Sequence, residues 1–153
     1  MKALVLYDSR YGNTQKVAET VANAIGNGTR SKHVDDADVK DLAALDLLVV
    51  GSPTHGGRPS EKTQAFLSSL SGNSLDGVSV AAFDTRISED QGFFLRIFMK
   101  MIQYAAPRIQ KKLDKSGGSR AGNPEGFIVE GREGPLADKE LERAAKWAKA
   151  LCA

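Results

Sequence analysis

The chain has 153 residues, of which 41% are hydrophobic and 26% charged, a size and composition typical of one globular domain spanning residues 1–153. Its net charge of +2 is too small to indicate nucleic-acid binding, and no apolar run approaches the roughly 20 residues that a membrane span requires. The single cysteine, Cys152, cannot form an internal disulfide, so we expect a cytoplasmic protein.

The first half of the chain alternates between short apolar runs and segments with helical spacing. Leu4–Leu6 precedes turn-forming residues, and apolar residues then recur at helical spacing from Val17 to Ile25, which predicts strand, loop and helix. Residues 31–34 fit a short edge strand, and residues 41–45 fit a brief helix. Residues 46–51 are almost wholly apolar, which indicates a strand buried on both faces of a parallel sheet.

The second half continues the same alternation. A helix is predicted from Ser60, its N-cap, to Leu70, with Phe66, Leu67 and Leu70 facing inward, and strands are predicted at 77–83 and 126–130. A terminal helix over 138–151 carries Leu141, Ala144, Ala145, Ala148 and Leu151 on one face, and Trp147 packs it on the sheet. This alternation predicts an α/β fold with a doubly wound parallel sheet of five strands.

The segment Phe93–Tyr104 is apolar around most of a helical circumference. It fits an outer helix packed into the core, but one sheet face cannot cover so wide an apolar surface. The surplus could form a homodimer contact, cover a bound cofactor, or dock a redox partner or a membrane surface. Pro107 is expected to separate this segment from a basic helix over 108–115, whose charges fit a solvated face.

The loop Ser9-Arg10-Tyr11-Gly12-Asn13-Thr14 has the pattern of an anion site. It leaves the carboxyl end of a parallel strand and precedes a helix, whose free N–H groups and positive end favour an anion. It lacks the lysine of a nucleoside-triphosphate loop and the three glycines of a dinucleotide fingerprint, which favours a single terminal phosphate. A capped strand-to-helix turn without a ligand remains the alternative at this point.

Residues 5–21, which contain this loop, resemble the FMN-binding signature of flavodoxins at every defined position. Residues 51–59, Gly-Ser-Pro-Thr-His-Gly-Gly-Arg-Pro, resemble the second flavin loop of that family, and residues 83–86 resemble the third. The three segments stand in the family's order and spacing. The resemblance implies a flavodoxin-like three-layer sandwich with FMN as its cofactor.

The resemblance also implies which residues contact FMN. The phosphate contacts would be Ser9, Arg10, Tyr11, Gly12, Asn13 and Thr14. The ribityl chain and one ring face would contact Pro53, Thr54, His55, Gly56 and Gly57. The other ring edge would contact Asp84, Thr85 and Arg86. The flavin performs the redox step itself, so no catalytic residue is expected, and the two histidines lack the companions of a metal site.

The sequence departs from the family pattern in two ways. Electron-transfer flavodoxins usually hold the flavin between two aromatic side chains, whereas this chain has His55 and Arg86-Ile87 there, which predicts a less negative low-potential couple. Flavodoxins are typically acidic, whereas the pI here is about 8.7. An acidic protein partner or a small-molecule electron acceptor is therefore expected.

Three functions are consistent with the sequence. The leading hypothesis is an FMN-binding electron carrier that exchanges one or two electrons with redox partner proteins. The alternative is an FMN-dependent NAD(P)H:quinone-type reductase with an open flavin face. A flavin-free scaffold is disfavoured because the phosphate loop is intact.

Overall fold

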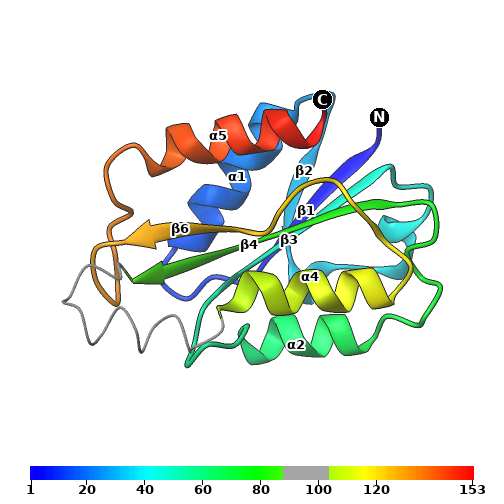
Figure 1. The fold of residues 1–153 in the computed structure, drawn as a ribbon, viewed down its shortest axis with the longest axis horizontal. Helices are drawn as coiled ribbons and strands as arrows, with labels where there is room; N and C mark the ends of the chain where they lie inside the picture. Colours follow the sequence, from blue (N-terminus) through cyan, green and yellow to red (C-terminus); the bar gives the residue numbers. More distant parts are fainter. Residues whose placement is uncertain (88–103) are drawn as a thin grey trace.

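A computed structural model describes residues 1–87 and 104–153 of the chain. A central parallel sheet lies between two layers of helices (Figure 1). Two 3-10 helices span Val34–Asp36 and Val39–Leu42. The remaining elements, in chain order, are β1 (Ala3–Tyr7), α1 (Asn13–Ile25), β2 (Arg30–His33), β3 (Leu47–Pro53), α2 (Glu61–Ser68), β4 (Ser79–Ile87), α4 (Ala105–Lys115), β5 (Ser119–Arg120), β6 (Glu125–Val129) and α5 (Glu140–Leu151).

The sheet has the strand order β2-β1-β3-β4-β5, and every pairing is parallel. The fifth position is shared by two segments, because β5 and β6 both pair with β4. Residues 121–124 separate them, and Pro124 within this stretch has no N–H to donate to a ladder. The predicted doubly wound, five-stranded sheet is confirmed, with its last strand divided into two parts.

Each face of the sheet has its own hydrophobic core. Helices α1 and α5 cover one face, and α2 and α4 cover the other (Figure 1). The first core centres on Val5, Val49 and Phe83, and the second on Leu6, Leu48 and Val80. Alternate residues of the same strands therefore enter opposite cores, which explains why these strands are apolar throughout. None of the described helices is long and apolar enough to cross a membrane.

Two predicted packing features are confirmed. The Ser60 hydroxyl accepts a hydrogen bond from the Thr63 N–H and so caps α2. Trp147 packs edge-on against Phe83 and Phe127, with ring centroids 6.1 and 6.0 Å away, and so joins α5 to the sheet.

Strand β4 is longer than predicted. It continues past Phe83 to Ile87, because β6 pairs with its second half from Phe83 to Ile87. The polar residues Asp84, Thr85 and Arg86 therefore belong to a strand and not to the loop that the sequence indicated. Their polarity hid the strand, because the pairing with β6 joins segments about forty residues apart along the chain.

Other predictions were wrong at element ends. The predicted helix over 41–45 is a 3-10 turn, Val39–Leu42, and Ala44 beyond it has a positive φ of 58° that no right-handed helix accommodates. Helix α4 begins at Ala105, so Pro107 lies in its first turn, where the missing N–H costs no hydrogen bond. Leu141 is 39% exposed and does not face the core.

The apolar segment Phe93–Tyr104, with the exception of Tyr104, lies outside the described residues.

A buried carboxylate anchors the start of α5 to β6. Glu140 accepts hydrogen bonds from the Ile128 N–H at 2.6 Å and from the Arg143 guanidinium at 2.7 and 2.9 Å. Arg143 also donates to the carbonyl of Gly126, and its guanidinium lies 4.6 Å from the Phe127 ring centroid. The Arg143 guanidinium and the Ile128 N–H hold the pKa of Glu140 below its ordinary value against the effect of burial.

Replacing Glu140 by glutamine should lower the free energy of unfolding at neutral pH by about 1–3 kcal/mol, because a charge-assisted hydrogen bond to Arg143 is lost. Since the pKa of Glu140 is lowered on folding, its contribution is complete above the ordinary value of 4.5 and disappears as the pH falls through the lowered one. Urea unfolding from neutral to acidic pH measures this. The difference between the two proteins should shrink below pH 4.5; a difference independent of pH would contradict the assignment.

Candidate cofactor-binding site

A cavity of about 310 Å³ lies where the carboxyl ends of β1, β3, β4 and β6 meet. Small-molecule sites occupy roughly 300–1,000 Å³, so this volume is at the lower end of the range. The lining residues come from four segments far apart in the sequence. They are Ser9, Arg10, Tyr11, Asn13, Thr14, Pro53, Thr54, His55, Thr85, Arg86, Ile87, Val129 and Arg132.

Most of the residues predicted to contact FMN are therefore neighbours in space, and their contact with FMN stays a prediction. Four of them do not line the cavity: Gly12, Gly56, Gly57 and Asp84. The structure assigns each of these another role, in the turn before α1, in a hairpin tip, or inside the protein. Sequence reasoning missed Val129 and Arg132, and it named Ile87 only together with Arg86 in place of an aromatic side chain; Ile87 and Val129 are strand ends at the same sheet edge.

The loop after β1 is closed by its own side chains. The Ser9 hydroxyl accepts from the Gly12 N–H at 3.1 Å, and Asp8 accepts from the Ser9 N–H at 2.9 Å. Gly12 has a φ of 93°, a conformation that a residue with a Cβ rarely adopts. This left-handed residue directs the chain from the loop into α1.

The first turn of α1 presents backbone donors to the cavity. Among the described residues, no acceptor bonds to the N–H groups of Asn13, Thr14 and Gln15, and the N-cap Gly12 has no side chain that could cap the helix. The turn also contains no acidic side chain. Free donors at the positive end of a helix form a site for an anion.

The charged side chains that line the cavity in the described residues are all positive. Arg10, Arg86 and Arg132 line it, and no carboxylate does so in the part of the chain that the structure describes. Arg86 is ion-paired, whereas Arg10 and Arg132 are exposed and form no ion pair with the described residues. The described lining of the cavity therefore carries net positive charge.

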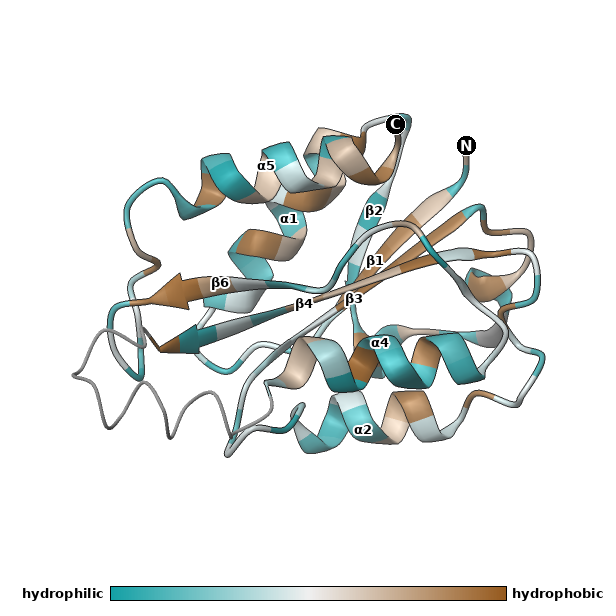
Figure 2. Cartoon of the chain, viewed as in Figure 1, coloured by the Kyte–Doolittle hydropathy of each residue, from teal (hydrophilic) through white to brown (hydrophobic). Residues whose placement is uncertain are grey.

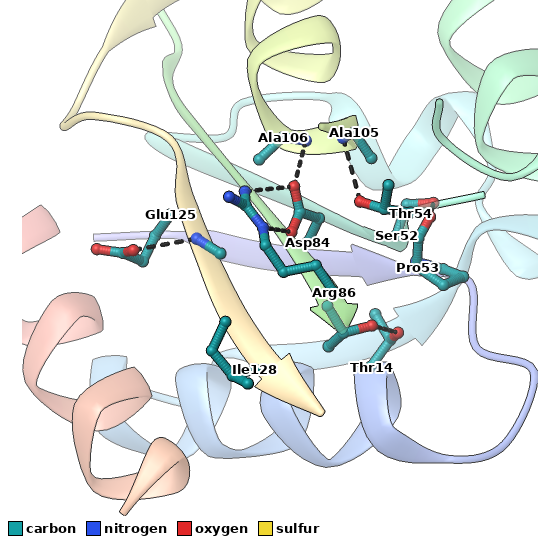
Figure 3. Close-up of polar contacts among 12 residues, drawn as sticks. Thr14, Ser52, Pro53, Thr54, Asp84, Arg86, Ala105, Ala106, Glu125 and Ile128 are labelled. Carbon is teal, nitrogen blue, oxygen red and sulfur yellow. Dashed lines mark hydrogen bonds and ion pairs between the residues drawn. The ribbon is translucent and has the colours of Figure 1, made fainter. Parts of the chain in front are cut away.

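Two buried hydroxyls connect the loop to the sheet. Thr14, at the start of α1, and Thr85, in β4, share a hydrogen bond of 2.8 Å between their Oγ1 atoms (Figure 3). Only one of the two protons is used in this bond. The other remains available to a group in the cavity that both residues line.

The carboxylate of Asp8 holds the loop by hydrogen bonds. It accepts from His33 Nε2 at 2.9 Å as well as from the Ser9 N–H. Burial raises the pKa of Asp8, but hydrogen bonds from Ser60 and His33 outweigh that effect, so the pKa lies below its ordinary value. The loop is thus tied to β2 and to the start of α2.

The second predicted loop is a tight hairpin between β3 and α2. His55 and Arg58 exchange two backbone hydrogen bonds, of 2.8 and 3.0 Å, across Gly56 and Gly57. Both glycines have positive φ, 57° and 78°, as the favoured two-residue hairpin turns require. His55 lies at the cavity edge, and the glycine pair forms the tip of the turn.

The third predicted segment divides into two roles. The side chain of Asp84 is fully buried and binds Arg86 in a bidentate pair, with distances of 2.7 and 2.8 Å (Figure 3). Asp84 also accepts from the Ala106 N–H at 2.8 Å, and Thr54 accepts from the Ala105 N–H at 3.2 Å. Asp84 of β4 and Thr54, the residue after β3, therefore cap α4.

The position of Arg86 is fixed on several sides. Its guanidinium lies 3.6 Å from the Tyr104 ring centroid, within the range of a cation–π contact. Burial raises the pKa of Asp84, an effect that Arg86 and the Ala106 N–H offset in part. Arg86 thus lines the cavity, whereas its partner Asp84 lies inside the protein.

Gly126 of β6 leaves room for this guanidinium, since a Cβ there would overlap Arg86. Gly126→Ala should therefore lower the free energy of unfolding by about 1–3 kcal/mol by displacing Arg86. The matched control is Gly72→Ala, because nothing lies within 4 Å of its Cβ position and its φ is ordinary. Urea unfolding of the three proteins measures the difference; equal stability of the two variants would contradict this packing.

Comparison with known proteins gives a consistent result. The family model described as "Flavodoxin" matches residues 5–147. A flavodoxin from Aquifex aeolicus is 42% identical over 91 residues, covering 55% of this chain and 49% of that protein. An "NAD(P)H dehydrogenase (quinone)" from Cupriavidus metallidurans is 36% identical over 100 residues, covering 50% of each. The chain thus spans about half the length of these two relatives.

The fold is that of solved flavodoxin structures. Oxidised Flavodoxin 2 from Bacillus cereus superposes with a TM-score of 0.78 and covers 99% of this chain and 98% of its own, at 20% sequence identity. Identity at that level shows the fold alone. The family match over nearly the whole sequence goes further: the chain belongs to the flavodoxin family.

Proposed function

We propose that the chain carries electrons between redox partner proteins by means of FMN bound in the cavity at the carboxyl edge of the sheet. FMN is the cofactor of the family to which the chain belongs. The observation that carries the proposal is the first turn of α1, with free N–H groups and no acidic side chain, opening on an electropositive cavity. These donors fit a terminal phosphate.

We assign the phosphate to the segment from Ser9 to Thr14. The N–H groups of Asn13 and Thr14 and the Thr14 hydroxyl would donate hydrogen bonds to it, and Arg10 would neutralise part of its charge. Arg132 adds a second cation from the segment after β6. A dianion would gain from each of these contacts.

We assign the ring to the remaining wall of the cavity. Pro53, Ile87 and Val129 supply apolar surface, and His55 and Arg86 supply polar edges. FMN, when bound, accepts and releases the electrons, and the protein contributes placement and a local field. The absence of carboxylates from the described lining favours added negative charge on the ligand.

The finer predictions on partners and compartment belong to this proposal. The pI of about 8.7 supports an acidic protein partner. A cytoplasmic location fits the lone cysteine. The homodimer contact proposed for Phe93–Tyr104 falls, except for Tyr104, on residues outside the described ranges.

The proposal predicts selectivity for the phosphate. Titration of the apoprotein with FMN and with riboflavin, followed by quenching of flavin fluorescence, should give an affinity for FMN higher by on the order of 100-fold. The double variant Arg10→Gln/Arg132→Gln should weaken FMN binding by about fivefold to tenfold and leave riboflavin binding unchanged. Lys149→Gln on α5 is the control. Equal affinities for FMN and riboflavin would rule out the assigned phosphate site.

The second candidate, an NAD(P)H:quinone reductase, is favoured by one observation: the Cupriavidus metallidurans relative carries that name. We expect the FMN-loaded protein to oxidise neither NADH nor NADPH in the presence of a quinone, and to exchange electrons with a small redox protein instead. Stopped-flow absorbance at the flavin band measures both reactions. Turnover of NADH or NADPH with a quinone would establish the enzyme in place of the carrier.

A further inference from the structure

A second hollow, of about 380 Å³, lies on the sheet face covered by α2 and α4. These two helices run side by side in Figure 1, and the hollow follows the groove between them. We call it the α2/α4 groove. Its lining includes Arg58 and Pro59 before α2, Leu67 of α2 and four cations of α4.

The cations of the groove form a regular row. Arg108, Lys111, Lys112 and Lys115 stand at helical positions i, i+3, i+4 and i+7, so they share one face of α4. We call them the α4 basic stripe. All four are exposed, and none forms an ion pair with a described residue. Figure 2 shows hydrophilic and hydrophobic stretches alternating along α4.

Nearby carboxylates do not neutralise this stripe. Asp114, the one acidic residue of α4, is bound to Arg120 of β5 at 2.8 Å and to Gln110 at 2.9 Å. Glu61 lies at the start of α2 and lines a neighbouring hollow with Arg58 and Lys62, not the groove. Like-charged side chains held on one helix face repel one another, so an anionic partner would relieve a cost that the free protein bears.

The groove leads to the candidate FMN site. Arg58 lines the groove, and its backbone exchanges two hydrogen bonds with His55, which lines the cavity. A molecule seated in the groove therefore reaches the hairpin at the cavity edge. The first N–H group of helix α4, that of Ala105, donates a hydrogen bond to Thr54, another residue that lines the cavity.

We propose that the α2/α4 groove is the docking surface for an acidic redox protein, which presents a surface segment with a row of carboxylates to the α4 basic stripe. The stripe extends over about 10 Å, the length of two helical turns. Asp or Glu side chains at the same spacing on a partner helix would match it. The apolar floor made by Leu67 and Pro59 suits the stems of such side chains.

A protein fits the groove better than a nucleic acid does. No aromatic side chain lines the groove among the described residues, whereas single-stranded nucleic acids are held by stacking of their bases on aromatic rings. The net charge of the chain is only +2, so the positive field is local to this face. The partner's redox role rests on the proposed function; its binding to the groove does not.

The binding test uses the full chain, with and without FMN, and a fluorescein-labelled poly-glutamate peptide of about 15 residues, long enough to cover the stripe. Fluorescence anisotropy at low salt should show binding that weakens as salt is added. The groove variant Lys111→Gln/Lys112→Gln/Lys115→Gln should bind about tenfold more weakly. The matched control removes the same charge from α5 and its N-cap, on the opposite side of the sheet: Lys139→Gln/Lys146→Gln/Lys149→Gln.

The kinetic test measures electron transfer from a reduced acidic [2Fe–2S] ferredoxin to the FMN-loaded protein by stopped flow. The groove variant should be slower by about tenfold at low salt, while its reduction by a photoexcited neutral deazaflavin stays at the rate of the unmodified protein. The opposite-face control should behave as the unmodified protein in both reactions.

The outcomes separate the two proposals. Equal weakening of poly-glutamate binding in both triple variants, or tighter binding of an equally charged oligonucleotide than of the peptide, would overturn the groove assignment. Loss of peptide binding in the groove variant with FMN affinity retained supports it. If the protein fails to bind FMN but still binds the peptide through the groove, the proposed function is wrong and the docking surface is still supported.

Discussion

The carboxylate of Asp84 lies inside the protein at the carboxyl end of β4, and its surroundings keep that charge compensated. A buried carboxylate is costly unless it is paired and fully hydrogen-bonded. Arg86 supplies a bidentate partner, and the start of α4 supplies the Ala106 N–H together with the positive end of its helix. One buried group therefore connects two features: the position of the Arg86 guanidinium and the starting point of α4.

This arrangement connects the cavity with the rest of the molecular surface. Thr54 and Asp84 hold the first two N–H groups of α4, so the helix leaves the sheet beside the cavity and its basic stripe runs away from that edge. The same carboxyl edge receives α1, whose first turn keeps its N–H groups free. The two helix starts thus have different roles. The N–H groups at the start of α4 are bonded within the protein, whereas those at the start of α1 are left for a ligand.

Much of this protein could be predicted from local patterns. The apolar runs of β1 and β3, the cap at Ser60 and the spacing of α1 each depend on neighbours within a few residues, so the order of elements and the sheet class follow from them. Parallel strands place their carboxyl ends at one edge, which brings the three predicted loops together without further information. The phosphate-binding role of the loop Ser9–Thr14 was predicted from its own residues for the same reason.

The sequence by itself therefore determined the fold class and the edge of the sheet that carries the cavity, since these depend on periodicity, and it predicted an anion site at Ser9–Thr14 from the start of a helix. Only the tertiary structure decided that Asp84 is a buried anchor and not a lining residue, that β4 reaches Ile87, and that Arg132 joins the cavity. It also placed α2 against α4, which converts a basic helix face into a groove. Each of these features depends on pairing or packing between segments far apart in the chain, and no local pattern records which distant residue will supply the partner.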